Sequence, residues 1–182
     1  SDIQGFTPLS EKMSPREVVQ LLNEYFESMV EIIHQNRGML DKFIGDAIMV
    51  HFGSPRTRED DALRAVQTGL EMQKRMQKIR GKWQKENRPG IHIRIGINSG
   101  TVIAGNIGCQ RRQEYTAIGD NVNIAQRLEA NAPPDSVLIS QSTYEKVRNF
   151  VIVEPLPPLQ VKGRTDPVQV YLVLDLQDNS SS

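Results

Sequence analysis

The stretch LDKFIGDAIMVHFG, residues 40–53, contains two short apolar runs separated by Gly45 and Asp46. A Gly-Asp pair between two such runs is typical of the turn of a β-hairpin. An aspartate at a turn is ordinary, because its short side chain bonds nearby backbone groups. The stretch therefore predicts a tight hairpin. It leaves open whether Lys42 and Asp46, on either side of the tip, are solvated residues or part of a site.

The composition is that of an ordinary globular chain. Its 182 residues are enough for one domain with a full core. The 22 Lys and Arg residues balance 22 Asp and Glu residues, so charge gives no reason to expect a nucleic-acid partner or contact with a membrane surface. Cys109 is the single cysteine, and no apolar run reaches transmembrane length. We expect a cytoplasmic location, with any membrane attachment made by other domains of a longer parent protein.

Helical and strand patterns alternate on both sides of this hairpin. A capping box at 14–17 begins a helix that ends near Gly38, and a longer helical pattern covers 57–87. Further strands are predicted at 91–97, 102–107, 137–140, 151–154 and 168–174, with helices at 120–130 and 141–149. We expect Ser99-Gly100 to join the first two of these strands as a second hairpin, and the prolines at 155, 157 and 158 to mark a loop between the last two. This order predicts an α+β fold with helices over a mainly antiparallel sheet.

The chain begins with SDIQGFT, residues 1–7, which reads as the exit from a strand followed by a turn at Gly5. We therefore expect a strand to precede Ser1 in the parent protein. Asp2 and Asp46 both fall where a strand meets a turn. Two carboxylates on adjacent strand ends can chelate two divalent ions and bridge them to phosphates, although either aspartate alone is an ordinary turn residue. The absence of GxxxxGK[ST], HExxH and paired CxxC motifs excludes P-loop, zincin and zinc-ribbon sites.

Four stretches, taken together, resemble the catalytic domain of class III nucleotidyl cyclases: SDIQGFT, DKFIGDAIMVHFG, RIGINSGTVIAGNIG and EYTAIGDNVNIAQRLE. The resemblance runs from Ser1 to about Leu174, with the motifs in the family's order. It implies one catalytic domain at 1–176, followed by a polar tail at 177–182. It also implies a ferredoxin-like βαββαβ core that forms head-to-tail homodimers. Such a domain converts a nucleoside triphosphate to its 3′,5′-cyclic monophosphate and pyrophosphate with two divalent metal ions.

The same resemblance assigns roles to individual residues. Asp2, Asp46 and the Ile3 carbonyl would bind two ions, Mg²⁺ or alternatively Mn²⁺ or Ca²⁺. Asn123 would position the ribose, and Arg127, four residues later on the same helix face, would stabilise charge on the α-phosphate. The other phosphates would meet a set of backbone groups and basic side chains: Gly5, Phe6, Thr7, Lys162, and either Arg111 or Arg112.

Two residues would read the base. Lys42 is a donor without an acceptor, so it suits adenine N1, which accepts, and opposes guanine N1, which donates. The Thr116 hydroxyl can accept from the adenine amino group. Thr116 replaces the family's commoner Asp, as in the subgroup of cyclases that respond to bicarbonate, so the resemblance also implies bicarbonate as an activator.

The expected assembly follows from Lys42 and Asp46 lying on either side of one hairpin turn. One chain cannot easily use both for one nucleotide, at the base and at the triphosphate. A two-fold dimer with sites shared across its interface resolves this. Three alternatives remain: a guanylyl cyclase, which Lys42 opposes; a nucleotide-binding regulatory domain, which the retained site residues oppose; and a diguanylate cyclase, whose GG[DE]EF-type turn is absent.

Overall fold

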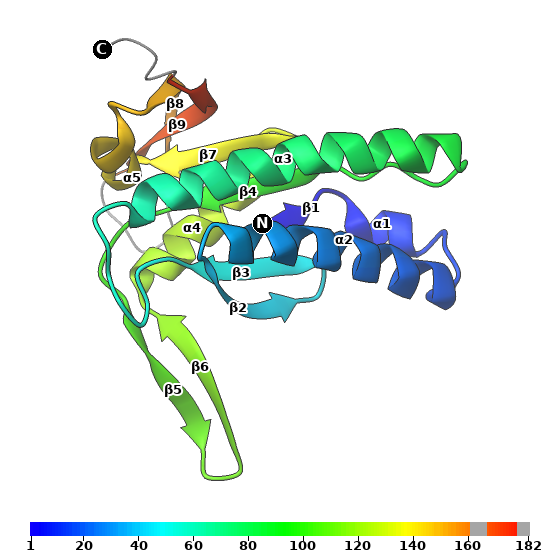
Figure 1. The fold of residues 1–182 in the computed structure, drawn as a ribbon, viewed down its shortest axis with the longest axis horizontal. Helices are drawn as coiled ribbons and strands as arrows, with labels where there is room; N and C mark the ends of the chain where they lie inside the picture. Colours follow the sequence, from blue (N-terminus) through cyan, green and yellow to red (C-terminus); the bar gives the residue numbers. More distant parts are fainter. Residues whose placement is uncertain (161–166, 178–182) are drawn as a thin grey trace.

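The computed structural model describes residues 1–160 and 167–177. In these residues the elements follow in this order: β1 (Asp2–Ile3), α1 (Phe6–Ser10), α2 (Pro15–Gln35), β2 (Met39–Ile44), β3 (Ala47–His51), α3 (Asp61–Lys85), β4 (Ile93–Ile97), β5 (Ile103–Cys109), β6 (Arg112–Ile118), α4 (Asp120–Asn131), β7 (Ser136–Ser140), α5 (Gln141–Val147), β8 (Val151–Leu159) and β9 (Val168–Leu176). Figure 1 shows α2 and α3 side by side along one side of the molecule. None of the helices in this part of the chain is both long and apolar enough to cross a membrane.

The central sheet has the strand order β1-β4-β7-β9-β8. Within it β4 and β7 are parallel, and the other neighbouring strands are antiparallel. The β2–β3 hairpin joins β1 through paired backbone hydrogen bonds of 2.9 Å between Ser1 and Ile48. Strands β4, β1, β3 and β2 therefore lie next to one another in that order. The predicted α+β class with a ferredoxin-like βαββαβ core is confirmed.

The alternation of side chains along β4 sets the layers of the fold. Ile93, Ile95 and Ile97 face the main core under α3, where they pack with residues such as Val66 and Met76. The intervening Arg94 and Gly96 face α4 on the other side of the sheet. The isoleucine repeat that predicts this strand therefore also decides which helix covers which face.

Helices α2 and α3 run antiparallel. Glu24 of α2 pairs with Lys82 of α3, and Glu31 pairs with Arg75, so the residue numbers run in opposite directions along the contact. Helix α2 begins at the predicted capping box, in which the Ser14 side chain accepts from the Glu17 backbone N–H. Its buried residues recur at helical spacing: Leu21, Tyr25, Met29, Ile32 and Ile33. These residues share one core cluster with the buried Ile48 of the β2–β3 hairpin.

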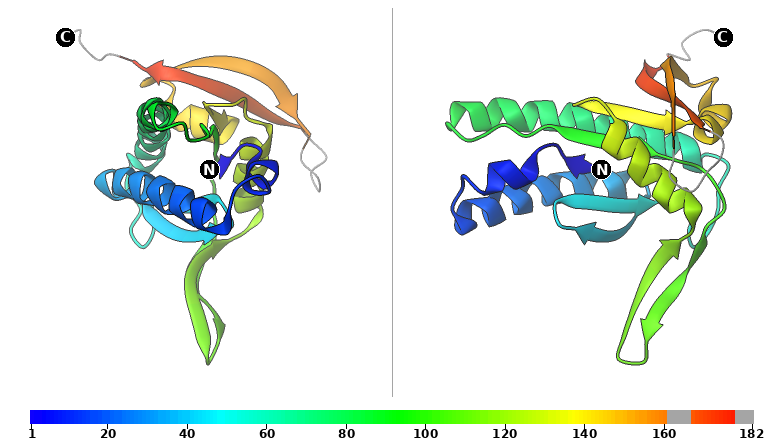
Figure 2. Two further views of the ribbon diagram at one scale, coloured as in Figure 1. Left: turned by 90° about the vertical axis from the view of Figure 1, so that its right-hand side faces the viewer. Right: turned by 180° about the vertical axis from the view of Figure 1, so that it is seen from behind.

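Strands β5 and β6 form a separate two-stranded arm that extends away from the body of the molecule (Figures 1 and 2). The predicted hairpin between 91–97 and 102–107 is therefore wrong, and strand β6 was not predicted. The reason is that β4 is an inner strand whose two edges are taken by β1 and β7. Strand β5 has to find its partner further along the chain.

The proline-marked loop is also wrong, because β8 continues through Pro155, Pro157 and Pro158 to Leu159. β8 lies at the edge of the sheet, where a residue without an N–H is tolerated. The pairing with β9 shifts between Leu156 and Leu159, which takes up the irregularity. Helix α1 was not predicted, and most of the polar tail, residues 178–182, lies outside the described residues.

Candidate active site

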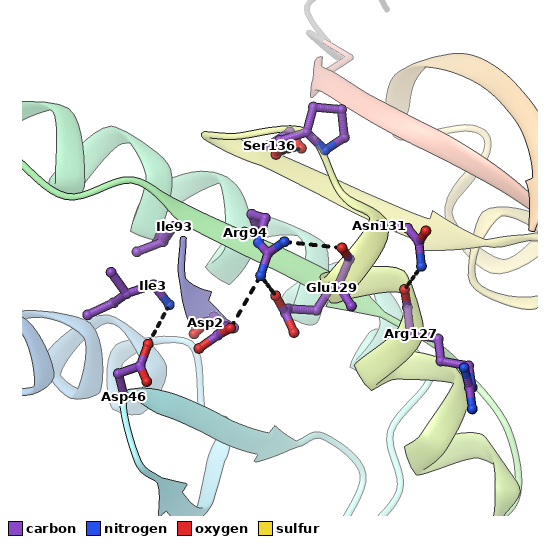
Figure 3. Close-up of polar contacts among 12 residues, drawn as sticks. Asp2, Ile3, Asp46, Ile93, Arg94, Arg127, Glu129, Asn131 and Ser136 are labelled. Atoms are coloured by element: carbon purple, nitrogen blue, oxygen red, sulfur yellow. Dashed lines mark hydrogen bonds and ion pairs between the residues drawn. The ribbon is translucent and has the colours of Figure 1, made fainter. Parts of the chain in front are cut away.

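The two predicted metal-binding carboxylates meet where β1 lies against the turn of the β2–β3 hairpin. The Ile3 backbone N–H donates to Asp46 Oδ2 at 3.2 Å, and Figure 3 shows the Asp2 and Asp46 side chains close together. Gly45 adopts φ +63°, a left-handed conformation that glycine reaches without strain. The glycine of the Gly-Asp pair therefore makes the turn, and the aspartate after it is held at the sheet edge.

We call the place where the Asp2 and Asp46 side chains meet the carboxylate corner. Its electrostatics disfavour two ionised carboxylates without a bound cation. Burial, together with the neighbouring Asp2 carboxyl, raises the pKa of Asp46 to about 6. Arg94 lies 3.3 Å from Asp2, but it also pairs with Glu129 at 3.0 Å, so one cation is shared between two acids (Figure 3). Burial and the charge of Asp2 raise the pKa of Glu129 as well. The corner therefore has an excess of negative charge that a bound cation would offset.

The donor set fits a hard divalent cation. Carboxylate and carbonyl oxygens are the ligands that Mg²⁺, Mn²⁺ and Ca²⁺ prefer. Among residues 1–160 and 167–177, no group of three or more His, Cys, Asp or Glu side chains is arranged to hold a metal ion. The two carboxylates and the nearby Ile3 carbonyl would supply oxygen ligands of this kind. Mg²⁺ is commonly bound in this way, with one or two carboxylates plus substrate phosphates.

The expected phosphate-binding residues follow directly. Gly5 has φ +65° and precedes α1, which starts at Phe6 and Thr7. A Cβ at Gly5 would meet nothing within 4 Å, so the glycine is needed for its conformation and not for space. The first N–H groups of a helix lack partners inside the helix, so this turn exposes donors next to the carboxylate pair.

Helix α4 carries the predicted catalytic residues. Asn123 and Arg127 line one surface hollow together with Asp120, Gln126 and Ala130, because residues three and four apart share a helix face. Ile124 and Leu128 are turned inward into the smaller core cluster under the sheet. Two residues beyond Arg127, Glu129 reaches Arg94 near the carboxylate pair, so Arg127 itself lies on another side of the helix. In Figure 3 the Arg127 side chain points away from Asp2 and Asp46.

The predicted base-reading residues lie together on β2 and β6. Lys42 donates to Glu114 at 3.3 Å, and Thr116, two residues further along β6, donates to Asp41 at 2.7 Å. Asp41 was not predicted as a site residue. One signal was available, since two successive charged residues interrupt an apolar strand at Asp41-Lys42.

Of the remaining basic residues predicted to bind phosphate, the two that the structure describes lie on the β5–β6 arm. Arg111 lies in the exposed turn at the tip of the β5–β6 arm, and Arg112 pairs with Glu114 at 2.6 Å. Lys162 lies outside the described residues. The predicted residues therefore form three separate groups: the carboxylate corner, the α4 hollow, and the Lys42–Thr116 pair.

Comparisons with known proteins agree with the resemblance. The adenylate and guanylate cyclase catalytic domain family matches residues 1–175. Adenylate cyclase 1 of Rhizobium meliloti (strain 1021) is 32% identical over 176 residues, which are 96% of this chain and 26% of that protein. The chain thus spans about a quarter of the length of this curated relative.

Two solved structures are similar over nearly the whole chain. The adenylyl cyclase CyaB from P. aeruginosa has a TM-score of 0.94 at 38% identity, with 99% of this chain and 93% of that chain covered. The guanylyl cyclase Cya2 also has a TM-score of 0.94, at 37% identity, with 98% and 91% covered. Overall similarity therefore does not distinguish an adenylyl cyclase from a guanylyl cyclase.

Proposed function

Since the chain belongs to the family of adenylate and guanylate cyclase catalytic domains, we propose that it converts ATP to 3′,5′-cyclic AMP and pyrophosphate. The observation that carries this proposal is the carboxylate corner of Asp2 and Asp46, next to the glycine turn that precedes α1. The ribose 3′-oxygen attacks the α-phosphorus, the bond from that phosphorus to the bridging oxygen of the β-phosphate breaks, and pyrophosphate leaves. The relatives that make cyclic AMP support ATP as the substrate.

Cyclases of this family generally use divalent metal ions. Asp2, Asp46 and the Ile3 carbonyl would hold two of them, with Mg²⁺ or Mn²⁺ as the first candidates and Ca²⁺ as a further one. Bound there, the ions would lower the pKa of the ribose 3′-hydroxyl and neutralise part of the triphosphate charge.

The remaining roles belong to the chain's own side chains and backbone. Backbone N–H groups of Gly5, Phe6 and Thr7 would donate to the β- and γ-phosphates. Asn123 would orient the ribose, and Arg127 would donate to the α-phosphate oxygens as negative charge develops on them. Lys162 and one of Arg111 and Arg112 remain candidates for the terminal phosphates.

We place these groups in sites shared across a head-to-tail homodimer. Arg127 points away from the carboxylate corner of its own chain (Figure 3), so a second copy would have to supply it. The β5–β6 arm adds support, because its Ile103, Ile107 and Ile118 side chains are exposed on a projecting hairpin. Exposed apolar side chains on such an arm favour contact with a partner. Each of the two equivalent sites would combine the carboxylates of one protomer with α4 and Lys42 of the other.

Three further points remain proposals. Thr116 suggests bicarbonate as an activator, tested by comparing equal bicarbonate and chloride at constant pH. The second candidate function is a guanylyl cyclase, which the similarity to Cya2 favours and Lys42 opposes. A cytoplasmic location remains our expectation for the domain.

The deciding experiment is to identify the products after incubation with MgATP, MnATP, MgGTP and MnGTP separately. We expect cyclic AMP and pyrophosphate, formed with ATP at a higher kcat/KM than cyclic GMP from GTP. Cyclic GMP as the main product would favour the guanylyl alternative. Nucleotide binding without pyrophosphate release under all four conditions would favour a regulatory domain.

A further inference from the structure

Asp41 lies in an irregular part of the β2–β3 hairpin. Leu40 pairs with Val50 and Lys42 with Met49, so Asp41 is the extra residue of a β-bulge. In a regular strand, neighbouring side chains point to opposite faces. Here both Asp41 and Lys42 reach toward β6, to Thr116 and Glu114 respectively. The bulge therefore brings two successive polar side chains to one side.

The Asp41 side chain is fully buried, with 0% of its surface exposed. Its Oδ2 accepts from the Thr116 hydroxyl at 2.7 Å and from the Ala117 backbone N–H at 3.1 Å. Its Oδ1 has no hydrogen bond but lies 3.5 Å from the Lys42 ammonium. One buried carboxylate thus contacts both residues that the proposed function assigns to the base.

His51 is the other titratable group packed against this carboxylate, with Nδ1 at 3.8 Å from Asp41 Oδ2. Burial lowers the pKa of His51, although the Asp41 charge works in the opposite direction. His51 faces Oδ2, and the Lys42 ammonium is the cation beside Asp41 Oδ1.

The hydrogen bond to Asp41 decides whether the Thr116 hydroxyl donates or accepts toward a third group. A carboxylate can only accept, so the Thr116 hydroxyl must give its single proton to Asp41. Only its lone pairs remain for a third group, and Thr116 becomes an acceptor. Without a fixed partner, the same hydroxyl would rotate and donate equally well.

We propose that Asp41 is the positioning residue that makes this site select adenine, by holding Thr116 as an acceptor beside the Lys42 ammonium, which can only donate. This inference rests on the proposed function, in which Lys42 and Thr116 face the base. The adenine edge presents an N6 donor and an N1 acceptor, which match an acceptor and a donor respectively. The guanine edge presents O6 as an acceptor and N1–H as a donor, so both contacts would oppose like with like. A site built around such hydrogen bonds rejects the wrong base by leaving buried polar groups unpaired.

The test compares Asp41→Ala with Asp41→Asn and measures kcat/KM for ATP and for GTP with each. Asp41→Ala frees the Thr116 hydroxyl to donate to guanine O6, so we expect the ATP/GTP ratio to fall about tenfold or more. In Asp41→Asn, the Ala117 N–H has to be met by the amide oxygen, since the amide nitrogen would oppose donor to donor. The oxygen then also accepts from Thr116, so we expect this variant to keep a ratio within about threefold of the wild type.

Two further variants test whether Asp41 acts on the base preference through Thr116. In Thr116→Val there is no hydroxyl to orient, so adding Asp41→Ala should change the ratio less than about twofold. Glu114→Gln is the matched control for charge, because it removes the other carboxylate that contacts Lys42 and leaves Thr116 untouched. We expect it to keep the wild-type ratio. If Asp41→Ala does not fold, Thr116→Ser against Thr116→Val carries the test, since only serine keeps a hydroxyl that can donate to Asp41.

The outcomes separate this inference from the proposed function. A wild-type protein that makes cyclic GMP faster than cyclic AMP refutes the proposed function. A wild-type preference for ATP that survives Asp41→Ala refutes only the role of Asp41. So does a ratio in Asp41→Asn as low as in Asp41→Ala, or an equal drop in the Thr116→Val background. If the serine comparison is the one used, equal ratios in Thr116→Ser and Thr116→Val refute it too. A merely structural defect would lower kcat/KM for both nucleotides together and leave their ratio unchanged.

Discussion

At the scale of the residue, Asp2 and Asp46 form a corner whose charge is not balanced by the side chains around it. Burial and the Asp2 carboxyl raise the pKa of Asp46 to about 6, and the nearby Arg94 is shared between Asp2 and Glu129. Such an arrangement destabilises the folded chain unless a cation binds there. Binding of a divalent ion should therefore be measurable as stability, apart from any turnover.

The first prediction concerns Asp46→Asn. An ion present at about 100 times its Kd should stabilise the wild type by about 2.7 kcal/mol, which raises Tm by roughly 5–10 °C for a domain of this size. The variant lacks one of two carboxylate ligands, so it should lose this shift, and its turnover should fall at least ~100-fold. Its Tm without ions should match or exceed that of the wild type, because a repulsive charge is removed.

The measurement is thermal melting with and without Mn²⁺, alongside cyclic nucleotide formation. Asp175→Asn is the matched control, since Asp175 is an exposed aspartate that pairs only loosely with Lys74 at 3.7 Å. It should keep both the ion-dependent shift and the turnover. An Asp46→Asn variant that keeps both would rule out Asp46 as a metal ligand.

Single residues also set the limit of what the sequence could predict about the site. The positions of Asp2 and Asp46 in the fold were predictable, because each stands at a strand–turn boundary, which local sequence records. The contacts of Asp41 were not predicted, because they depend on a β-bulge and on Thr116, 75 positions away in the chain. Neither the bulge nor that contact leaves a periodic pattern in the sequence.

At the scale of the element, the contact between β4 and α4 holds the Asn123 and Arg127 helix in place. Gly96 allows the approach, since a Cβ there would lie 2.2 Å from the Glu129 backbone nitrogen and 2.3 Å from the Ala125 carbonyl oxygen. Both are backbone atoms, so they cannot move without moving the helix. The position of α4 therefore depends on Gly96 in the neighbouring strand having no side chain.

The second prediction follows for Gly96→Ala. Overpacking should lower the free energy of unfolding by roughly 1–3 kcal/mol or more. Displacement of Arg127 by even about 1 Å should lower turnover by roughly 100-fold at temperatures where the variant is fully folded. Gly81→Ala is the matched control: it lies on the exposed side of α3, a Cβ there meets nothing within 4 Å, and it should gain up to about 1 kcal/mol. Normal turnover in folded Gly96→Ala would contradict the proposed role of this close approach.

The third prediction concerns the α2–α3 contact at Glu24. Burial works to raise the pKa of Glu24, but hydrogen bonds from Lys82 and Arg88, each 2.8 Å long, outweigh it and lower the pKa to about 2. A carboxyl whose folded pKa is lowered stabilises the fold above its unfolded pKa of about 4.5, and this contribution is lost as the pH falls toward about 2.

Urea unfolding of the wild type and Glu24→Gln at several pH values checks this prediction. The stability difference should be largest near pH 7 and should shrink as the pH falls below about 4.5. Glu31→Gln removes a more exposed carboxylate that forms one ion pair, with Arg75, and accepts one hydrogen bond from Gln35, so it should show a smaller difference. A Glu24→Gln gap that does not change with pH would mean that the hydrogen bonds, not the charge, stabilise the contact.

The elements show the same division between local and distant information. Capping and helical spacing predicted α2 and all of α3, with a few residues too many at each end of α3, and the Gly-Asp turn predicted the β2–β3 hairpin. The predicted partner of β5 was wrong, because an isoleucine repeat identifies β4 as a strand but does not show that it is an inner strand. The prolines of β8 were misread for the same reason, since only the sheet order reveals an edge.

At the scale of the whole molecule, one chain does not bring together the candidate site residues that the structure describes. The carboxylate corner faces one way and the Arg127 side chain points another (Figure 3). Lys42 lies only four positions from Asp46 and reaches across to β6 instead of toward the corner. A two-fold dimer that contributes complementary halves would complete two sites at once.

The fourth prediction tests this assembly with Asp46→Ala and Arg127→Ala. Each variant alone should be nearly inactive, because both sites of its homodimer carry the same defect. In an equimolar mixture about half of the dimers are mixed, and each mixed dimer has one site with both defects and one site with none. Activity should therefore return to roughly a quarter of the wild-type value per milligram after re-equilibration. Dilution below the dimer dissociation constant should remove it again, since folded monomers would retain only half-sites.

Mixing Asp46→Ala with Asp2→Ala is the matched control, because both substitutions lie in the same half and every site of their mixed dimer is defective. Size analysis must establish that mixed dimers formed. If they form and the Asp46→Ala and Arg127→Ala mixture is no more active than this control, each chain works with its own residues and the shared site is wrong.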